Sequence, residues 1–160
     1  RGLGDVYKRQ WSKATESPLA QAAVRGAEKI TVRPLLGHSG KAVKLPKGAS
    51  LSYDFYCDKS GDARFTIAAI PCFLNAVKDM RVSVSIDRGE PVICQLKEVY
   101  NSKDWQFDLW RGQTLKSFYV TLPGGSHNVT IKALDDNVMI DQWVLDYDVD
   151  REYYVFPVAK

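Results

Sequence analysis

The chain has 160 residues and a formal net charge of +3, and 45% of its residues are hydrophobic and 26% charged. This length suits one domain whose core needs no metal ion or disulfide for support. Lysine and arginine alternate with acidic residues and form no basic block, so no nucleic-acid partner is expected. No apolar run reaches the roughly 20 residues that a bilayer requires, so no membrane partner is expected either.

The first part of the chain carries little pattern. Residues 1–10 (RGLGDVYKRQ) show neither a helical stripe nor a strand alternation. Residues 11–26 are predicted to form an irregular lead-in, although the segment 17–29 (SPLAQAAVRGAEK) also fits a short helix. The folded domain is therefore predicted over residues 27–160.

From residue 49 onward, apolar and polar residues alternate with a period of two in several segments. This alternation is typical of half-buried strands. The segments 114–122 (TLKSFYVTL) and 137–147 (NVMIDQWVLDY) are rich in β-branched and aromatic residues and are predicted as two more strands, with Trp143 in the core. The predicted inward-facing sets are Leu51, Tyr53, Phe55 and Cys57; Phe65, Ile67 and Ala69; Val82, Val84 and Ile86; and Val129, Ile131 and Ala133.

Turn sequences separate these strands. DKSGDA, DRGEP and LPGGSH place glycine or proline where the chain must reverse, and strands recur about every ten residues without intervening helices. This spacing predicts an all-β fold, an antiparallel β-sandwich of the jelly-roll, galactose-binding-like type. The exception is the segment 101–113 (NSKDWQFDLWRGQ), predicted as a helical turn in a long loop, capped by Asn101 or Ser102 with Asp104 in its first turn.

The sequence contains no recognisable catalytic motif, because both GxSxG and HExxH are missing. His38 and His127 are each expected in a surface loop. Cys57, Cys72 and Cys94 are expected to be buried free thiols, with one disulfide and one free thiol as the alternative. The many carboxylates would suit calcium, but no spacing selects a ligand set. A structural calcium ion stays open, and no other cofactor is expected.

The clearest binding chemistry lies in the segment 101–113, where two tryptophans occur among polar residues. A pyranose stacks its C–H bonds on an aromatic face, and its hydroxyls need planar donors and acceptors nearby. An arginine can also pair with the carboxylate of a uronic acid. The alternative is that the tryptophans close the end of the sandwich. The predicted carbohydrate-contacting set is Trp105, Trp110, Arg111, Asn101 and Asp104.

A series of segments resembles the C-terminal domain of glycoside hydrolase family 115, over about Ala27 to Val158. Two positions depart from the family pattern. Arg111-Gly112 stands where members often carry Arg-Asn, which removes a polar group from the loop, and Asp136-Asn137-Val138 stands where members often carry Pro-Gly-Val. The segments that carry the resemblance are LLGHSGKAVKLP, IAAIPCFLN, RVSVSIDRGEPV, KDWQFDLWRGQ and GSHNVTIKALDDNVMIDQWVLDYD.

Members of that family are xylan α-glucuronidases, in which this domain is a β-sandwich after the catalytic modules. The resemblance therefore implies a non-catalytic accessory domain of a larger bacterial enzyme that is secreted or periplasmic. Its expected partners are the missing catalytic module and xylan or glucuronoxylan. The alternative is a purely structural domain that docks on the catalytic module or mediates dimerisation. The fold is also similar to carbohydrate-binding modules of families 6 and 35, which bind sugars at loops and often hold calcium.

Residues 1–10 resemble the translation of a sequencing-library adapter. They are therefore expected to be a non-native segment in front of a truncated gene product, and to pack against nothing. A genuine linker is the alternative.

Overall fold

The computed structural model describes residues 12–13, 31–38, 40–73 and 78–150. Residues 1–10 and the whole segment 17–29 lie outside this part, so the adapter and short-helix predictions are not addressed there, and of the predicted lead-in 11–26 only Ser12 and Lys13 are described, as a short strand. The elements are β1 (Ser12–Lys13), β2 (Thr31–Pro34), β3 (Lys41–Leu45), β4 (Ser50–Cys57), β5 (Gly61–Ala69), β6 (Arg81–Ile86), β7 (Val92–Gln95), α2 (Lys103–Arg111), β8 (Thr114–Leu122), β9 (Gly125–Ala133) and β10 (Val138–Asp146).

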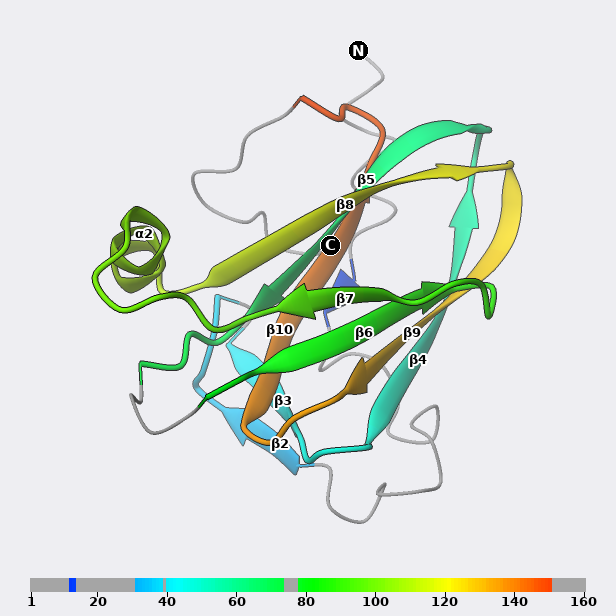
Figure 1. Ribbon diagram of the computed structural model, residues 1–160. Helices are drawn as coiled ribbons and strands as arrows, with labels where there is room; N and C mark the ends of the chain where they lie inside the picture. Colours follow the sequence, from blue (N-terminus) through cyan, green and yellow to red (C-terminus); the bar gives the residue numbers. More distant parts are fainter. Residues whose placement is uncertain (1–11, 14–30, 39, 74–77, 151–160) are drawn as a thin grey trace.

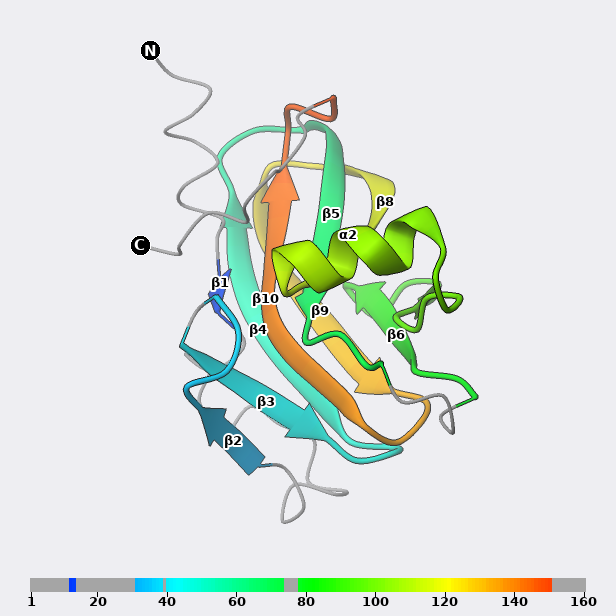
Figure 2. The ribbon, with the colours of Figure 1, turned by 90° about the vertical axis from the view of Figure 1, so that its left-hand side faces the viewer.

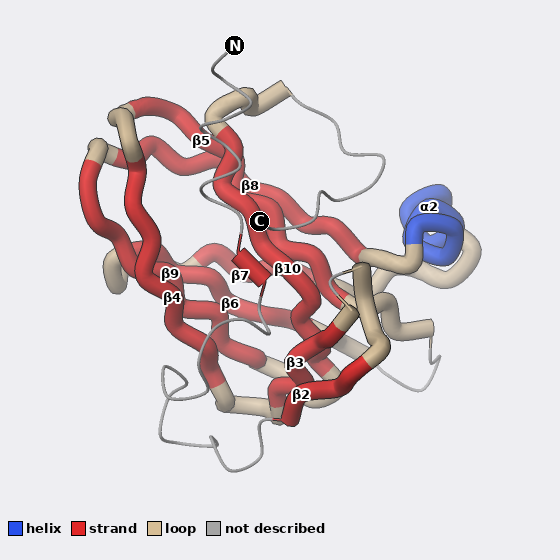
Figure 3. Tube along the Cα trace, turned by 180° about the vertical axis from the view of Figure 1, so that it is seen from behind, coloured by secondary structure: helices blue, strands red, loops and turns tan. Residues whose placement is uncertain are grey.

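These strands form two antiparallel sheets packed face to face (Figure 1), which confirms the predicted all-β sandwich. The larger sheet has the order β2-β3-β10-β5-β8, and β1 pairs with β10. The smaller sheet has the order β4-β9-β6-β7. Seen from behind, the helix stands apart from both sheets at one side of the sandwich (Figure 3).

The core lies between the sheets and is built from the predicted alternating positions. The inward residues of β4, β5, β6 and β9 are buried, and only Phe55 and Ile86 are partly exposed while they pack against the same core. Trp143 of β10 is 1% exposed and lies at the centre of an aromatic cluster. Its ring stacks on Phe65 at 5.4 Å and meets Tyr53 edge-on at 5.7 Å. The predicted core positions are therefore confirmed.

Two strands depart from the half-buried pattern. On β5 the outward residues Thr66 and Ala68 are buried as well, and on β10 so are Gln142 and Val144. Leu115 of β8 packs against Ala68 and Val144 on this outer face. Leu115 thus covers part of the outer face of both strands, and strands buried on both faces lose a clean alternation. The prediction that they are half-buried is wrong for this reason.

Helix α2 replaces the helical turn predicted in the long loop. Ser102, not Asn101, is its N-cap, because the Ser102 hydroxyl accepts a hydrogen bond from the Trp105 backbone N–H at 3.1 Å. Gly112 ends the helix with φ +68°, and its N–H donates to the carbonyl of Asp108 at 2.8 Å. The helix has nine residues, which gives its side chains defined faces.

All three cysteines are free. The prediction of free thiols is therefore confirmed and the disulfide alternative is wrong, whereas the predicted burial is confirmed for Cys57 and Cys94 and wrong for Cys72, which is partly exposed. Burial raises the pKa of the Cys57 and Cys94 thiols. None of the described residues belongs to a helix long and apolar enough to cross a membrane.

Candidate functional site

Helix α2 buries a carboxylate and exposes two of its three aromatic rings, the reverse of the usual arrangement in a water-soluble domain. Asp108 is 3% exposed, whereas Trp110 is 82%, Phe107 54% and Leu109 49% exposed. The helix lies outside the sheets in a second view as well (Figure 2). We name the exposed group of Phe107, Leu109 and Trp110 the α2 face. Grouped apolar side chains in contact with water are typical of a contact surface.

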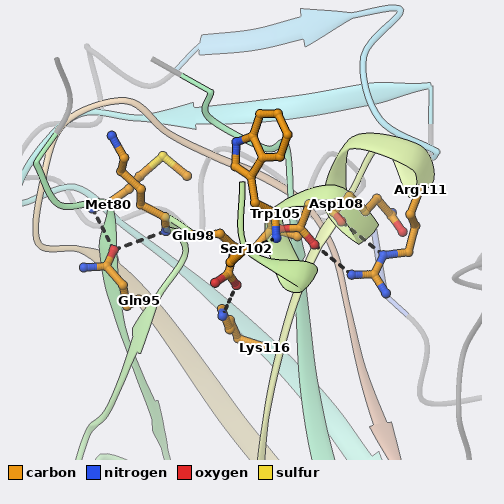
Figure 4. A network of polar contacts seen from close by, with 11 residues as sticks. Met80, Gln95, Glu98, Ser102, Trp105, Asp108, Arg111 and Lys116 are labelled. Atoms are coloured by element: carbon orange, nitrogen blue, oxygen red, sulfur yellow. Dashed lines mark hydrogen bonds and ion pairs between the residues drawn. The ribbon is translucent and has the colours of Figure 1, made fainter. Parts of the chain in front are cut away.

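Polar contacts of Asp108 fix this orientation. The Thr114 hydroxyl donates to Oδ2 of Asp108 at 2.7 Å, and Nη2 of Arg111 donates to Oδ1 at 2.9 Å (Figure 4). Burial raises the pKa of the Asp108 carboxyl, and these two hydrogen bonds oppose the rise. The carboxylate ties the inner side of α2 to the start of β8, so the α2 face must point outward.

Arg111 is held inside the domain by two contacts. Besides its ion pair with Asp108, its Nε donates to the carbonyl of Gln113 at 3.1 Å, and its side chain is 19% exposed. These contacts use two of the five guanidinium N–H donors, and the low exposure of the side chain gives the other three little access to a ligand. The predicted sugar contact of Arg111 stays a prediction, and its observed contacts are internal.

The two predicted tryptophans have different surroundings. Trp105 is partly buried and meets Tyr100 edge-on at 5.0 Å and Phe73 at 5.6 Å. Figure 4 shows Trp105 at the beginning of the helix, away from the Asp108–Arg111 pair. Trp110 instead meets only Phe107 among the described aromatic rings, at 6.4 Å. Trp105 therefore packs the helix onto its neighbours, and Trp110 presents its ring to solvent.

The remaining predicted residues lie at the first turn of the helix. Asn101 has φ +61°, and its side-chain oxygen accepts a hydrogen bond from Gln106 at 3.2 Å. Asp104 is exposed. Sequence reasoning missed Lys103, which shares the outer side of the helix with Phe107 and Trp110 at spacings of four and seven residues. Lys103 forms no ion pair with another described residue, and its helical spacing was the signal that could have found it.

Three of the segments that carry the family resemblance meet behind this helix. The His38 backbone N–H donates to Oδ2 of Asp141 at 2.9 Å, and Nε2 of His38 donates to the carbonyl of Arg111 at 2.7 Å. Nε2 of Gln113 donates to the same Asp141 oxygen at 2.7 Å. Asp141 and Gln113 are fully buried. This cluster anchors the end of α2 to β10, so these segments have a structural role.

A second polar feature lies on the outer face of the smaller sheet. We name it the β4–β9 groove, a hollow of about 510 Å³. It was not predicted, although its residues from β4 and β9 occupy the outward positions of the predicted alternation. Its lining consists of Ser52, Asp54, Asp87, Arg88, Asn128 and Thr130.

His127 lies beneath one end of this groove, and its predicted position in a surface loop is wrong. It belongs to β9, is 7% exposed, and precedes Val129 by two residues, so the period of two places it inward. Its Nδ1 lies 2.6 Å from Oδ2 of Asp87, and its Nε2 lies 2.7 Å from the carbonyl of Pro123. Because both ring nitrogens face acceptors, the doubly protonated imidazolium fits this site best.

This pair predicts a pH-dependent contribution to stability. Burial opposes the charge on His127, but the hydrogen bonds to Asp87 and Pro123 outweigh it and raise the pKa of His127. Burial likewise opposes the charge on Asp87, but hydrogen bonds from His127 and the Asn128 N–H lower its pKa. A histidine whose pKa is raised in the folded state stabilises the fold fully at pH values below its pKa in the unfolded chain. An aspartate whose pKa is lowered in the folded state stabilises the fold fully at pH values above its pKa in the unfolded chain. The pair therefore contributes most between about pH 4 and pH 6.5.

We expect His127→Gln to lower the free energy of unfolding by about 1 kcal/mol between about pH 4 and pH 6.5. The difference should shrink as the pH rises through the folded pKa of His127, and also as it falls through that of Asp87. Urea unfolding at a series of pH values measures it. A difference that grows steadily above pH 7 would contradict the assignment of an imidazolium.

Among the described residues, no group of three or more His, Cys, Asp or Glu side chains is placed to hold a metal ion. The question of a structural calcium ion therefore stays open.

A sequence model of the glycosyl hydrolase family 115 C-terminal domain matches residues 21–159. No curated protein matches the chain. Among solved structures, the chain is similar to a family GH115 4-O-methyl-alpha-glucuronidase with specificity for decorated arabinogalactans, with a TM-score of 0.70 and 26% identity. The similarity covers 84% of this chain but only 17% of that protein.

Two isolated modules share the fold. A family 35 carbohydrate-binding module from Clostridium thermocellum has a TM-score of 0.60 and 14% identity, over 85% of this chain and 97% of the module. A carbohydrate-binding module of Cellvibrio mixtus lichenase 5A, in complex with cellotriose, has a TM-score of 0.60 and 16% identity, over 86% of this chain and 96% of the module. At these identities the likeness concerns the fold alone. Because the family model spans nearly the whole sandwich, the chain belongs to the glycosyl hydrolase family 115 C-terminal domain family.

Proposed function

We propose that this chain is a non-catalytic accessory domain of a secreted or periplasmic family 115 glycoside hydrolase, and that it contacts glucuronoxylan through the α2 face. The family match supports an accessory role, because it concerns the C-terminal domain and not a catalytic module. The similar glucuronidase acts on a sugar that carries a carboxylate, and the modules that share the fold bind carbohydrate. The observation that carries the proposal is the helix that buries Asp108 and exposes Trp110.

The α2 face offers the two kinds of contact that a glucuronic acid substituent needs. The Trp110 ring supplies an apolar plane for stacking against sugar C–H bonds. Lys103 shares this side of the helix and supplies a cation for the sugar carboxylate, a role that the ion pair with Asp108 takes away from Arg111. Asp104 and Asn101 supply acceptors for hydroxyls. The stack, the ion pair and the two hydroxyl hydrogen bonds contribute about 1 kcal/mol each, about 4 kcal/mol in all, so the affinity should be weak, with a Kd of roughly 1 mM.

Calorimetric titration with a xylo-oligosaccharide that carries one 4-O-methylglucuronic acid tests this proposal. We expect saturable binding that Trp110→Ala weakens about tenfold, because the stacking surface is lost. Lys103→Ala should weaken binding of the acidic oligosaccharide and leave a neutral one unaffected. The matched control is Tyr119→Ala, which removes a ring that is 71% exposed on β8, away from the helix. Undiminished binding by Trp110→Ala would contradict the proposal.

A second candidate function is docking, and the aliphatic part of this surface favours it. Leu109 is 49% and Val99 77% exposed, and neither side chain has a ring on which a sugar can stack. Exposed aliphatic and tryptophan side chains together suit a protein interface, either with the rest of a hydrolase or with a second copy of the domain. In that case the domain gives no heat with the oligosaccharide and instead dimerises in sedimentation experiments, and Trp110→Ala abolishes the dimer.

A further inference from the structure

We propose that the β4–β9 groove is a second carbohydrate site, which binds a neutral oligosaccharide chain. The groove belongs to the smaller sheet, whereas α2 is tied to β8 of the larger sheet. Its volume of about 510 Å³ falls within the usual range of small-molecule sites. The inference goes beyond the proposed function of the α2 face and does not depend on it.

The floor of the groove is an ordered set of polar side chains. Strand register places Asp54 directly opposite Asn128 and Ser52 opposite Thr130. Nδ2 of Asn128 donates to Oδ1 of Asp54 at 2.8 Å, and Oδ1 of Asn128 accepts from the Ser52 hydroxyl at 3.0 Å and from Thr130 at 3.3 Å. Side chains held by one another in this way lose little entropy when a ligand binds.

The end wall of the groove is the turn after β6. Both Asp87 and Arg88 adopt left-handed backbone conformations, with φ +53° and +59°. Asp87 is fixed by His127 and by the Asn128 N–H, which donates to its Oδ1 at 2.8 Å. Arg88 is exposed, and its guanidinium forms no hydrogen bond or ion pair with another residue in the described ranges. The turn therefore places the free N–H donors of Arg88 beside the Asp87 carboxylate, which is held in position by its hydrogen bonds.

The donor and acceptor pattern selects a polyhydroxylated ligand. Sugar hydroxyls both donate and accept, so adjacent hydroxyls can satisfy the Arg88 donors together with the Asp54 and Asp87 acceptors. Tyr56 follows Asp54 on the same face of β4, is 62% exposed and lies outside the groove lining, so its ring can flank a chain that extends beyond the groove. The combination of a planar guanidinium, carboxylates, an amide and a ring is suited to binding saccharides.

The charges favour a neutral ligand over an acidic one. Asp54 forms no ion pair with the described residues, so its carboxylate would repel a uronic acid or a phosphate at the centre of the groove. The charge of Asp87 is balanced by His127. Arg88 is the one unpaired cation in the lining. This preference is the opposite of that expected for the α2 face, where Lys103 favours an acidic sugar.

Nuclear magnetic resonance titration of the ¹⁵N-labelled protein tests the inference with three neutral probes: xylohexaose, cellohexaose and a β-1,3-galactan oligosaccharide. We expect at least one probe to shift the amide signals of residues 52–54 and 128–130 in a saturable way. Arg88→Gly and Tyr56→Ala should each weaken binding about tenfold, the loss expected for a charged hydrogen bond or a sugar stack. Glycine accepts the left-handed conformation at residue 88, so this variant should keep its fold.

Two controls separate this groove from the α2 face. Ser83→Ala changes a residue of β6 on the same outer face but outside the groove lining, and it should bind like the wild type. In Trp110→Ala the groove amides should also shift with the neutral probe as they do in the wild type, because Trp110 lies outside the groove lining. The inference is overturned if none of the probes shifts the groove amides of the folded protein at millimolar concentrations. It is equally overturned if both Arg88→Gly and Tyr56→Ala bind with unchanged affinity.

Discussion

Replacement of Trp143 by alanine should lower the free energy of unfolding by about 3 to 5 kcal/mol. Trp143 is 1% exposed and contacts Phe65, Tyr53 and Phe55, so its removal leaves a cavity that rings on both sheets cannot close. Domains of this size are stable by about 5 to 15 kcal/mol, so the loss is a large share of the total. Urea unfolding followed by circular dichroism measures it.

Trp110→Ala is the matched control for this prediction, because it removes the same side chain from a position that is 82% exposed. It should change the unfolding free energy by no more than about 0.5 kcal/mol. Trp143→Phe provides a second comparison, because the Trp143 indole N–H is buried without a hydrogen-bond partner among the described residues. Phenylalanine keeps an aromatic ring and removes that unsatisfied group, so it should cost clearly less than alanine. Equal losses for Trp143→Ala and Trp110→Ala would refute the burial argument.

Replacement of Gly37 by alanine is the second change with a large expected effect, a loss of roughly 3 to 5 kcal/mol. An alanine Cβ at this position would lie 2.4 Å from Cγ and Oδ1 of Asp141, and Gly37 has φ +72°. The Asp141 carboxylate is fully buried and accepts hydrogen bonds from His38 and Gln113. A shift of this carboxylate breaks those bonds and leaves a buried charge poorly satisfied.

Gly40→Ala isolates the cost of the clash. Gly40 has a similar φ of +82°, but nothing lies within 4 Å of the position of its Cβ. This variant should lose only about 1 kcal/mol, the cost of a left-handed alanine. A double-mutant cycle with Asp141→Ala should show that the extra loss of Gly37→Ala depends on the carboxylate. If Gly37→Ala and Gly40→Ala lower the free energy of unfolding by the same amount, the close approach of Gly37 and Asp141 does not contribute to stability.

The residue types of the candidate site in the segment 101–113 were predictable from the sequence, but their arrangement was not. The sequence indicated that residues 101–113 bring exposed aromatic rings and charges together, and Trp110 and Asp104 are indeed exposed. It could not show that Arg111 is held by Asp108, or that Lys103 takes the outer side of the helix. Those outcomes depend on Thr114 and Gln113 of the following strand region, which accept or donate at the inner side of α2. Helical spacing alone gives no means of choosing which side is inner.

The sequence by itself determined the sandwich and most of its core. Inward positions such as Val82, Val84, Val129 and Ile131 follow from alternation, because a strand turns successive side chains to opposite faces whatever lies around it. The glycine and proline residues of the turns likewise show where the chain reverses, because they favour turn conformations through their own backbone geometry.

Tertiary structure alone decided which polar side chains lie together. His38 meets Asp141 across 103 positions of sequence, and Asn128 meets Asp54 across 74. Contacts of this kind depend on which strands become neighbours and in which register they pair, and a shift of one residue would turn Asp54 into the core. The burial of both faces of β5 and β10 has the same origin, since coverage of a strand depends on elements distant in the chain. The strands and turns of the domain therefore follow from residues close together in the sequence, whereas the arrangement of its polar side chains depends on residues that are far apart in it.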